Sequence, residues 1–215
     1  MHYAYLELEK YDNVDDEKFY QYNEVDPVDI LRTSYEQCIR DCTMEGIIGS
    51  STALIAILRE DELRIANLGD CGISIIRRND FTFRSEEQQH SFNFPYQLGT
   101  GSFDTPQDAQ RYTIKVQCGD IVILGSDGIF DNLFEEDILE EIDRFFCPRT
   151  GTPSVHPQMI SEALAYRAKN ASEDLNNPSP FQSRAMQEGL YYLGGKKDDI
   201  SVLVGIVTDS KDFSN

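Results

Sequence analysis

The stretch Asp120–Asn132, Asp-Ile-Val-Ile-Leu-Gly-Ser-Asp-Gly-Ile-Phe-Asp-Asn, organises the interpretation of the whole chain. Its branched apolar run Ile121–Leu124 is typical of a strand that is buried on both faces. Glycines stand close on both sides of Asp127, so this carboxylate can sit at a tight bend at the end of the strand. Asp131 follows at i+4, which predicts that both carboxylates lie on one side of a helical turn, close enough to share a hard cation.

The same residues also have a purely structural interpretation. A strand-to-helix turn with Asp127 as its N-cap would explain Ser126, Asp127 and Gly128 without any cation. The motif alone leaves both interpretations open.

Two further strand ends present an aspartate beside or near glycine. Asp198 and Asp199 follow Gly-Gly-Lys-Lys and directly precede the apolar run Ile200–Val207. Asp70 ends the segment Ile-Ala-Asn-Leu-Gly-Asp, in which an apolar strand again delivers a carboxylate. Three such strand ends predict a site with several oxygen ligands for Mg²⁺ or Mn²⁺.

Length and charge limit the class of protein. The 215 residues predict one domain over 1–215, with an acidic N-terminal segment over 1–25 and a polar tail over 209–215. The formal net charge is -19, which disfavours nucleic acid and anionic bilayers as partners and favours divalent cations. A phosphorylated substrate would approach such a surface only where bound cations reverse the local field.

Cysteine usage predicts an intracellular protein. The five cysteines are odd in number and scattered, which predicts reduced thiols in an intracellular protein. Cys38 and Cys42 stand at i and i+4, but the three histidines are far apart in sequence, so a zinc site is the weaker alternative. No apolar run reaches transmembrane length, and the N-terminus resembles no targeting segment, so we expect no membrane insertion.

Hydrophobic periodicity predicts an α+β fold. Asp26-Pro27 predicts the start of a helix that continues through Ile39. Antiparallel strands are expected over 52–58, 63–68, 73–76 and 81–83 as a meander, then over 112–116 and 121–124 as a pair, and finally over 200–207. Helices are expected over 134–146, 158–169 and 181–188, and 84–110 as an irregular segment. Antiparallel strands in two groups with inserted helices predict a layered sandwich.

One rival chemistry has a matching spacing. Cys71 and Arg77 satisfy the Cys-x5-Arg pattern of cysteine-dependent phosphatases, in which a loop of backbone N–H groups grips the phosphate. The intervening residues include three isoleucines and no loop-forming pattern, so they predict a strand whose N–H groups are used in a sheet. The sequence also contains no Gly-x-Ser-x-Gly elbow for serine chemistry.

Taken together, the motifs resemble the metal-dependent (type 2C) protein serine/threonine phosphatases, and within them the mitochondrial branch. The resemblance rests on Gly-Ser-Ser-Thr-Ala at 49–53, Ala-Asn-Leu-Gly-Asp at 66–70, the segment 85–98, Ser-Asp-Gly-Ile-Phe-Asp-Asn at 126–132 and Gly-Gly-Lys-Lys-Asp-Asp-Ile at 194–200. Each motif is weak alone, but their order and spacing cover nearly the whole chain.

The resemblance implies a sandwich of two antiparallel sheets flanked by helices, with two Mn²⁺ or Mg²⁺ ions in the family's site. By position, Asp127 and Asp198 resemble ligands of the metal pair, and Asp70 and Asp131 resemble ligands of an additional, weaker cation. Asp199 stands where many relatives have Asn, so it is expected beside the ligands, as is Asn132. In the family a metal-activated water attacks phosphoserine or phosphothreonine of a phosphoprotein substrate without a phosphoenzyme.

One departure from the family pattern is evident. The family carries an earlier Asp-Gly-x-Gly-Gly segment, whose Asp bridges both metals, and upstream of it a phosphate-binding Arg. The one Asp-Gly of this chain is at Asp127. We therefore expect an N-terminally incomplete fold with weaker metal binding. The alternatives are a phosphatase with impaired activity and a noncatalytic phosphatase-like module that binds partners or divalent cations.

Overall fold

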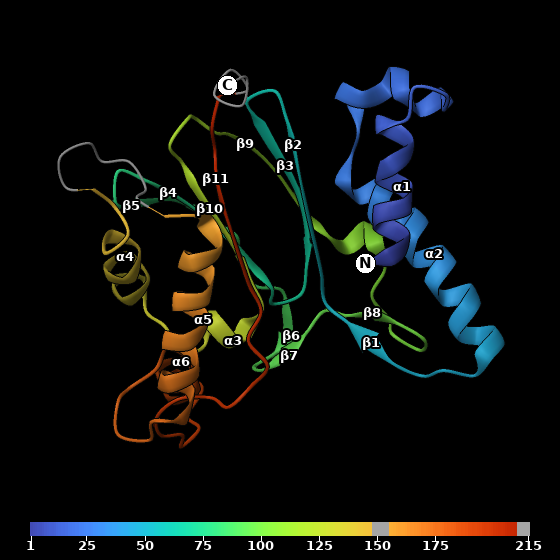
Figure 1. Ribbon diagram of the computed structural model, residues 1–215. Helices are drawn as coiled ribbons and strands as arrows, with labels where there is room; N and C mark the ends of the chain where they lie inside the picture. Colours follow the sequence, from blue (N-terminus) through green and yellow to red (C-terminus); the bar gives the residue numbers. More distant parts are fainter. Residues whose placement is uncertain (148–154, 210–215) are drawn as a thin grey trace. The chain divides into compact units, whose positions relative to one another are not determined.

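The computed structural model describes residues 1–147 and 155–209, and the chain divides into two compact units (Figure 1). The first unit comprises Met1–Asp70 and Glu87–Val116, and the second comprises Cys71–Glu86 and Gln117–Asn215. Each unit has its own antiparallel sheet and its own hydrophobic core. Nearly all of the expected tail at 209–215 lies outside the described residues.

The helices of the first unit begin near the N-terminus. They are α1 (His2–Asp12), the 3-10 helix η1 (Glu17–Glu24) and α2 (Pro27–Glu45). The predicted start of α2 is confirmed, because the Val28 N–H donates to the Asp26 carboxylate at 2.8 Å and Pro27 occupies the first turn. Gly46 ends α2 with a φ of 68°, a left-handed conformation that glycine adopts readily.

The sheet of the first unit has the strand order β2-β3-β9. Its antiparallel strands are β2 (Ala53–Arg59), β3 (Glu62–Leu68) and β9 (Gln110–Lys115). The segment expected to be irregular holds short elements, β6 (Gln89–Ser91), β7 (Phe94–Pro95), β8 (Leu98–Gly99) and the 3-10 helix η2 (Pro106–Asp108), and β8 pairs with β1 (Ser50–Ser51). Helix α2 packs against β2 and β3, so that Ile30 and Leu31 are buried in one core with Ile55, Ile57 and Leu68.

The sheet of the second unit has the order β11-β10-β4-β5. Its antiparallel strands are β4 (Gly72–Arg77), β5 (Asp80–Arg84), β10 (Ile121–Gly125) and β11 (Val202–Ile206). Ile123 of β10 lies between Ser74 of β4 and Val204 of β11 and is fully buried, as the apolar run in this strand predicts.

Two predicted strand pairings are wrong. The strands predicted as one meander divide after β3, because β3 pairs with β2 on one side and β9 on the other, which leaves no free edge for β4. The strands predicted over 112–116 and 121–124 do not pair with each other either, since β9 joins the first sheet and β10 the second. Because the connections are short, consecutive strands were expected to pair. Instead, β9 pairs with β3, and β10 pairs with β4 and β11.

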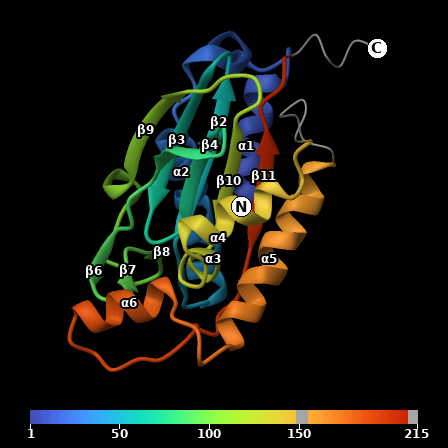
Figure 2. The same ribbon diagram turned by 90° about the vertical axis from the view of Figure 1, so that its left-hand side faces the viewer.

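Four helices belong to the second unit in the part of the chain that the structure describes. They are α3 (Asp127–Phe130), α4 (Glu135–Asp143), α5 (Pro157–Glu173) and α6 (Pro180–Gln187). Helix α4 ends before the predicted boundary at residue 146, and α5 extends beyond its predicted end at 169. Helix α5 lies alongside β11 in both views (Figures 1 and 2) and buries Ile160 and Leu164 with Ile123 and Ile142.

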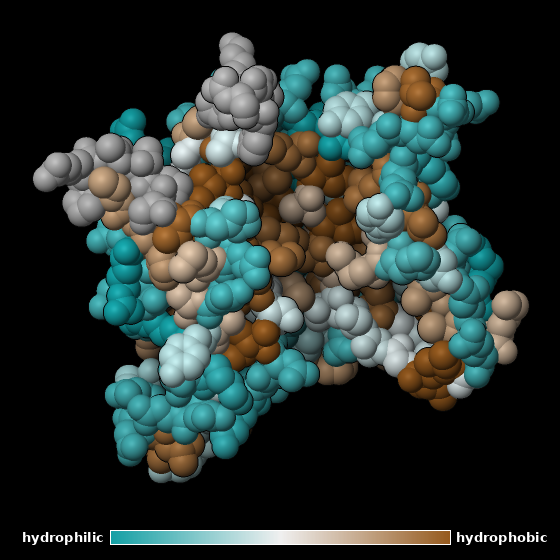
Figure 3. Space-filling view, in the orientation of Figure 1, coloured by the Kyte–Doolittle hydropathy of each residue, from teal (hydrophilic) through white to brown (hydrophobic). Residues whose placement is uncertain are grey.

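Strand β11 forms one edge of the second sheet, and its described backbone pairs only with β10. Leu203 on this strand is 68% exposed, and Figure 3 shows hydrophobic surface over β11, whereas the surface around α6 is mainly hydrophilic.

None of the helices within residues 1–147 and 155–209 has the length and apolar character needed to cross a membrane.

Candidate metal centre

Asp127 lies where strand β10 ends and helix α3 begins. Ser126 is the N-cap residue, and its N–H donates to the Ser201 carbonyl at 3.0 Å. The Ser126 hydroxyl donates to the Asp199 carbonyl at 3.1 Å and accepts from the Ser201 N–H at 3.1 Å. These three hydrogen bonds attach the start of α3 to the segment before β11 and so fix the position of Asp127.

The turn of α3 brings the second carboxylate to the same side. The Asp131 N–H donates to the Asp127 carbonyl at 2.7 Å, which is the i,i+4 contact of a helical turn. The two side chains therefore have the one-sided arrangement that their spacing predicts. Asp131 is the more deeply placed, with its side chain 4% exposed.

Gly128 allows the segment of Asp198 to approach α3. A Cβ atom at this glycine would collide with the Asp199 carbonyl oxygen and press against Ile200. A glycine is therefore required for close approach of the two backbones rather than for an unusual φ. This contact brings a segment close to the C-terminus next to the carboxylates of α3.

The side chain of Asn132 holds both the N–H group and the carbonyl group of Lys196. Its amide nitrogen donates to the Lys196 carbonyl at 2.9 Å and to the Gly128 carbonyl at 2.9 Å, and its Oδ1 accepts from the Lys196 N–H at 2.9 Å. The side chain is buried, so these bonds satisfy its polar atoms. Asn132 thus positions the segment that carries Asp198 without itself contacting a carboxylate of the cluster.

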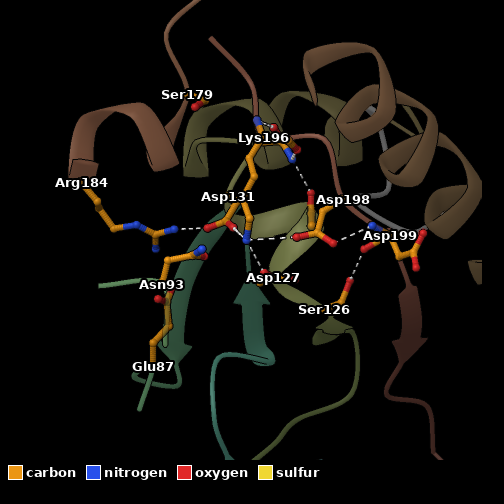
Figure 4. A network of polar contacts seen from close by, with 12 residues as sticks. Glu87, Asn93, Ser126, Asp127, Asp131, Ser179, Arg184, Lys196, Asp198 and Asp199 are labelled. Atoms are coloured by element: carbon orange, nitrogen blue, oxygen red, sulfur yellow. Dashed lines mark hydrogen bonds and ion pairs between the residues drawn. The ribbon is translucent and has the colours of Figure 1, made fainter. Parts of the chain in front are cut away.

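Three carboxylates converge on one position as a result. Each of Asp127, Asp131 and Asp198 offers an oxygen within 4.8 Å of the other two. The Lys196 ammonium lies among them, with Nζ 2.6 Å from Asp127 Oδ2, 2.7 Å from Asp131 Oδ2 and 3.0 Å from Asp198 Oδ2 (Figure 4). The Arg184 guanidinium, from α6, pairs with the other oxygen of Asp131.

Burial and charge act in opposite directions on these groups. Burial raises the pKa of Asp131, although contact with Lys196 and Arg184 opposes the rise. Burial lowers the pKa of Lys196, but its hydrogen bonds to Asp127 and Asp131 outweigh this effect, and the pKa is raised. The pKa of Asp198 is lowered, because bonds from Lys196 and the Asp199 N–H outweigh burial. The ammonium therefore stays charged among the carboxylates.

The chemistry of this donor set fits a hard divalent cation. Carboxylate oxygens are the ligands that Mg²⁺ and Mn²⁺ prefer. A cationic group, the Lys196 ammonium, already lies between the three side chains and stands where such an ion would be held. Asp131 is almost fully buried, so its charge has the greatest need of a compensating cation.

The described carboxylate cluster does not include Asp70 or Asp199, the two other aspartates that the sequence predicts for the site. Asp70 follows β3 in the first unit and is buried, and its role as a ligand of a weaker cation stays a prediction. Asp199 contributes through its backbone, since its N–H donates to Asp198 Oδ1 at 2.8 Å and its carbonyl accepts from Ser126. The side chain of Asp199 is not a member of the described carboxylate cluster.

Sequence reasoning missed Lys196 and Arg184. Lys196 stands two positions before Asp198, so its proximity to one carboxylate was visible in the sequence. Its contacts with Asp127 and Asp131 depend on tertiary packing. Nothing in the sequence around Arg184 indicates that it pairs with Asp131.

The rival cysteine chemistry disagrees with the structure. The residues after Cys71 form strand β4, and their backbone groups pair with β10. Arg77 is also engaged, because its Nε and a terminal nitrogen each donate to Asp120 at 2.7 Å. The segment therefore presents no phosphate-binding loop of N–H groups.

Comparison with known proteins gives relatives over most of the chain. No family model matches it. A "Probable protein phosphatase 2C 80" of Arabidopsis thaliana is 37% identical over 187 residues, which are 86% of this chain and 42% of the relative. A "Protein phosphatase PTC7 homolog" of Homo sapiens is 37% identical over 196 residues, which are 86% of this chain and 62% of the relative. The chain thus spans only part of the length of these relatives.

Solved structures resemble the chain as well. The photosystem II phosphatase PBCP is 29% identical with a TM-score of 0.78, over 96% of this chain and 78% of that chain. The catalytic domain of the serine/threonine phosphatase PstP, solved with two manganese ions, has a TM-score of 0.55 over 84% of this chain and 70% of that chain. At 16% identity, that second likeness concerns the fold alone.

Proposed function

Because this chain belongs to the type 2C protein phosphatase family, we propose that it hydrolyses phosphoserine and phosphothreonine in phosphoprotein substrates with the help of Mn²⁺ or Mg²⁺. The predicted α+β, type 2C phosphatase-like fold is confirmed by the same comparisons. The convergence of Asp127, Asp131 and Asp198 on one cation-sized position is the observation that supports the proposal most strongly.

The three carboxylates are the residues that would hold the cation. When bound, a divalent cation supplies charge stabilisation for phosphoryl oxygens and activation of a water for attack on phosphorus. The number of ions and the choice between Mn²⁺ and Mg²⁺ belong to the proposal, as does an additional weak site that includes Asp70. An intracellular, mitochondrial location remains a prediction from the resemblance.

The chain's own residues hold this arrangement in place. Ser126 fixes the backbone on either side of Ile200, and Asn132 fixes the backbone of Lys196. Both contacts keep Asp198 beside the carboxylates of α3. Rigid placement of ligands is what a metal site needs, because loosely held carboxylates lose affinity.

A noncatalytic phosphatase-like module is the second candidate, and one observation favours it. Lys196 and Arg184 already pair with the carboxylates, so two positive charges offset the three negative ones. A cluster that is largely neutralised by its own chain can serve as a structural element without catalysis.

An activity assay separates the two candidates. The 215-residue chain is incubated with a phosphothreonine peptide and Mn²⁺, and released phosphate is measured beside Asp127→Asn and the exposed control Asp15→Asn. The proposal predicts turnover that requires Mn²⁺, falls by about a hundredfold or more in Asp127→Asn and is retained in the control. Absence of turnover in every variant would favour the second candidate. Turnover that does not depend on Mn²⁺ would contradict the metal-dependent mechanism and would also exclude the noncatalytic candidate.

A further inference from the structure

The Lys196 ammonium occupies the position that a cation would take among the three carboxylates. Its side chain is 14% exposed, and Nζ lies within 3.0 Å of an oxygen of each carboxylate. We propose that Lys196 is a tethered competitor for the divalent cation: its ammonium holds the cluster together without metal and leaves when metal binds. The inference rests on the proposed metal site and concerns how that site is regulated.

Geometry makes the two cations mutually exclusive. The Oδ2 atoms of Asp127, Asp131 and Asp198 all point to Nζ, and these are the atoms that a shared metal ion would use (Figure 4). Hard divalent cations bind oxygen at about 2.0 to 2.6 Å, which requires the carboxylates to close around the ion. An ammonium at the same point would clash with the ion and repel it. Metal binding therefore requires the ammonium to move.

The main chain around Lys196 is anchored, so the movement is confined to the side chain. The Ser179 hydroxyl donates to the Gly194 carbonyl at 2.6 Å, and the Gly194 N–H donates to Gln182 Oε1 at 2.6 Å. Asn132 holds the backbone of Lys196 itself through two hydrogen bonds. The flexible four-carbon stem of lysine can then reorient without a shift of the loop.

The ring of Phe181, on α6, lies beside the ammonium in its present position. Nζ is 5.1 Å from the centre of this ring while it contacts the carboxylates, which is within the range of a cation–π contact. A rotation of the lysine stem that moves Nζ off the carboxylates and toward this ring would keep one favourable neighbour for the charge. Met has a similar length and no charge, so Lys196→Met tests the ammonium without removing the stem.

The proposal predicts opposite effects of Lys196→Met on the two states of the protein. Without metal, three clustered carboxylates lose their central positive charge, which destabilises the fold. With metal, the competitor is absent, which strengthens binding. A residue that only supports the fold would weaken both states, and a residue that assists the metal would weaken binding.

Calorimetric titration of the full chain with Mn²⁺, after removal of metal by EDTA, tests the predicted increase in Mn²⁺ affinity. Thermal unfolding tests the predicted loss of stability without metal. Lys197→Met is the matched control, because Lys197 is the next residue and is exposed. We expect Lys196→Met to bind Mn²⁺ about tenfold or more tightly than the unaltered chain, as loss of charge-assisted hydrogen bonds to the competitor implies. Its thermal midpoint in EDTA should fall, and its rise on addition of Mn²⁺ should exceed that of the control.

The outcomes also separate this inference from the proposed metal site. One result would overturn the competitor role alone. In that result the unaltered chain binds Mn²⁺, Asp127→Asn does not, and Lys196→Met binds Mn²⁺ equally or more weakly than the unaltered chain. The proposed metal site would then still stand. Absence of Mn²⁺ binding in both the unaltered chain and Lys196→Met would overturn both. Tighter binding by Lys197→Met as well would show a general effect of net charge and would also overturn the inference.

Discussion

The Lys196 ammonium lies 2.6 Å from Asp127 Oδ2 although 69 positions separate the two residues in the sequence. The contact exists because the segment before β11 packs directly on the turn of α3. Three features maintain this packing. They are the close approach at Gly128, the hydrogen bonds between the Asn132 side chain and nearby main-chain groups, and the hydrogen bond that the Ser201 N–H donates to the Ser126 hydroxyl. Substitutions that disturb this packing should therefore affect the cluster without removing a carboxylate.

Gly128→Ala is the sharpest test of the close approach. The added methyl group would collide with the Asp199 carbonyl oxygen and push the segment of Asp198 away from α3. We expect a loss of about 2 kcal/mol in the free energy of unfolding, measured by urea titration, together with weaker Mn²⁺ binding. The control is Gly205→Ala on β11, where an added Cβ meets nothing within 4 Å and a change below about 0.5 kcal/mol is expected. Equal stability of the two variants would refute the packing argument.

Asn132→Ala should uncouple the Lys196 backbone from α3. The substitution removes three hydrogen bonds of a buried side chain and leaves the main-chain groups of Lys196 without these partners. Chemical denaturation should show a loss of about 2 to 3 kcal/mol, and Mn²⁺ affinity should fall with it. Asn170→Ala on the exposed surface of α5 is the control and should be close to neutral. Unchanged Mn²⁺ affinity in Asn132→Ala would show that this amide does not position the site.

Asp120 provides a stability prediction away from the cluster. Its carboxylate is 1% exposed, accepts two hydrogen bonds from Arg77 and accepts a third from the Gln117 N–H at 2.8 Å. An asparagine side chain has only one acceptor oxygen, because its other terminal atom is an NH₂ donor. It therefore cannot accept all three of these hydrogen bonds. Asp120→Asn should therefore lower the free energy of unfolding at pH 7 by about 2 to 3 kcal/mol, against little change in the exposed control Asp143→Asn.

The same ion pair predicts a pH dependence. Burial favours the neutral acid, but the bonds from Arg77 and Gln117 outweigh it and hold the pKa of Asp120 below its ordinary value of 3.8. The folded state thus binds this proton less readily than the unfolded state, so the stabilisation is present above pH 3.8 and is lost as the pH falls through the lowered pKa. Urea titrations over this range should show the gap between the unaltered chain and Asp120→Asn shrinking on acidification. A gap that is constant with pH would contradict the assignment.

Much of the local structure could be predicted from the sequence because its causes are local. The Asp26-Pro27 pair fixes the start of α2 through a side-chain cap and a restricted φ. Apolar runs identify β10 and its neighbour β4, since burial on both faces leaves few polar positions. The pairing of β2 with β3 was predicted, but the pairing of β3 with β9 was not, because a strand's pattern specifies its faces and not its neighbour.

The candidate site could also be predicted only in part. The i,i+4 spacing predicts the relation of Asp127 to Asp131 directly, whereas the approach of Asp198 was inferred from its place at a strand end and from the family resemblance. Lys196 was missed because a lysine beside two aspartates usually belongs to a solvated surface. Its insertion among the carboxylates depends on long-range contacts that no local pattern records.

In the proposed site, Asp127, Asp131 and Asp198 together bind a divalent cation in place of the Lys196 ammonium. The most direct measurement is anomalous X-ray scattering at the manganese edge from crystals of the chain soaked in Mn²⁺. We predict a manganese peak within bonding distance of oxygens from all three carboxylates, with the Lys196 side chain moved away from them. A map with no peak there, and with the ammonium still between the carboxylates, would contradict the account.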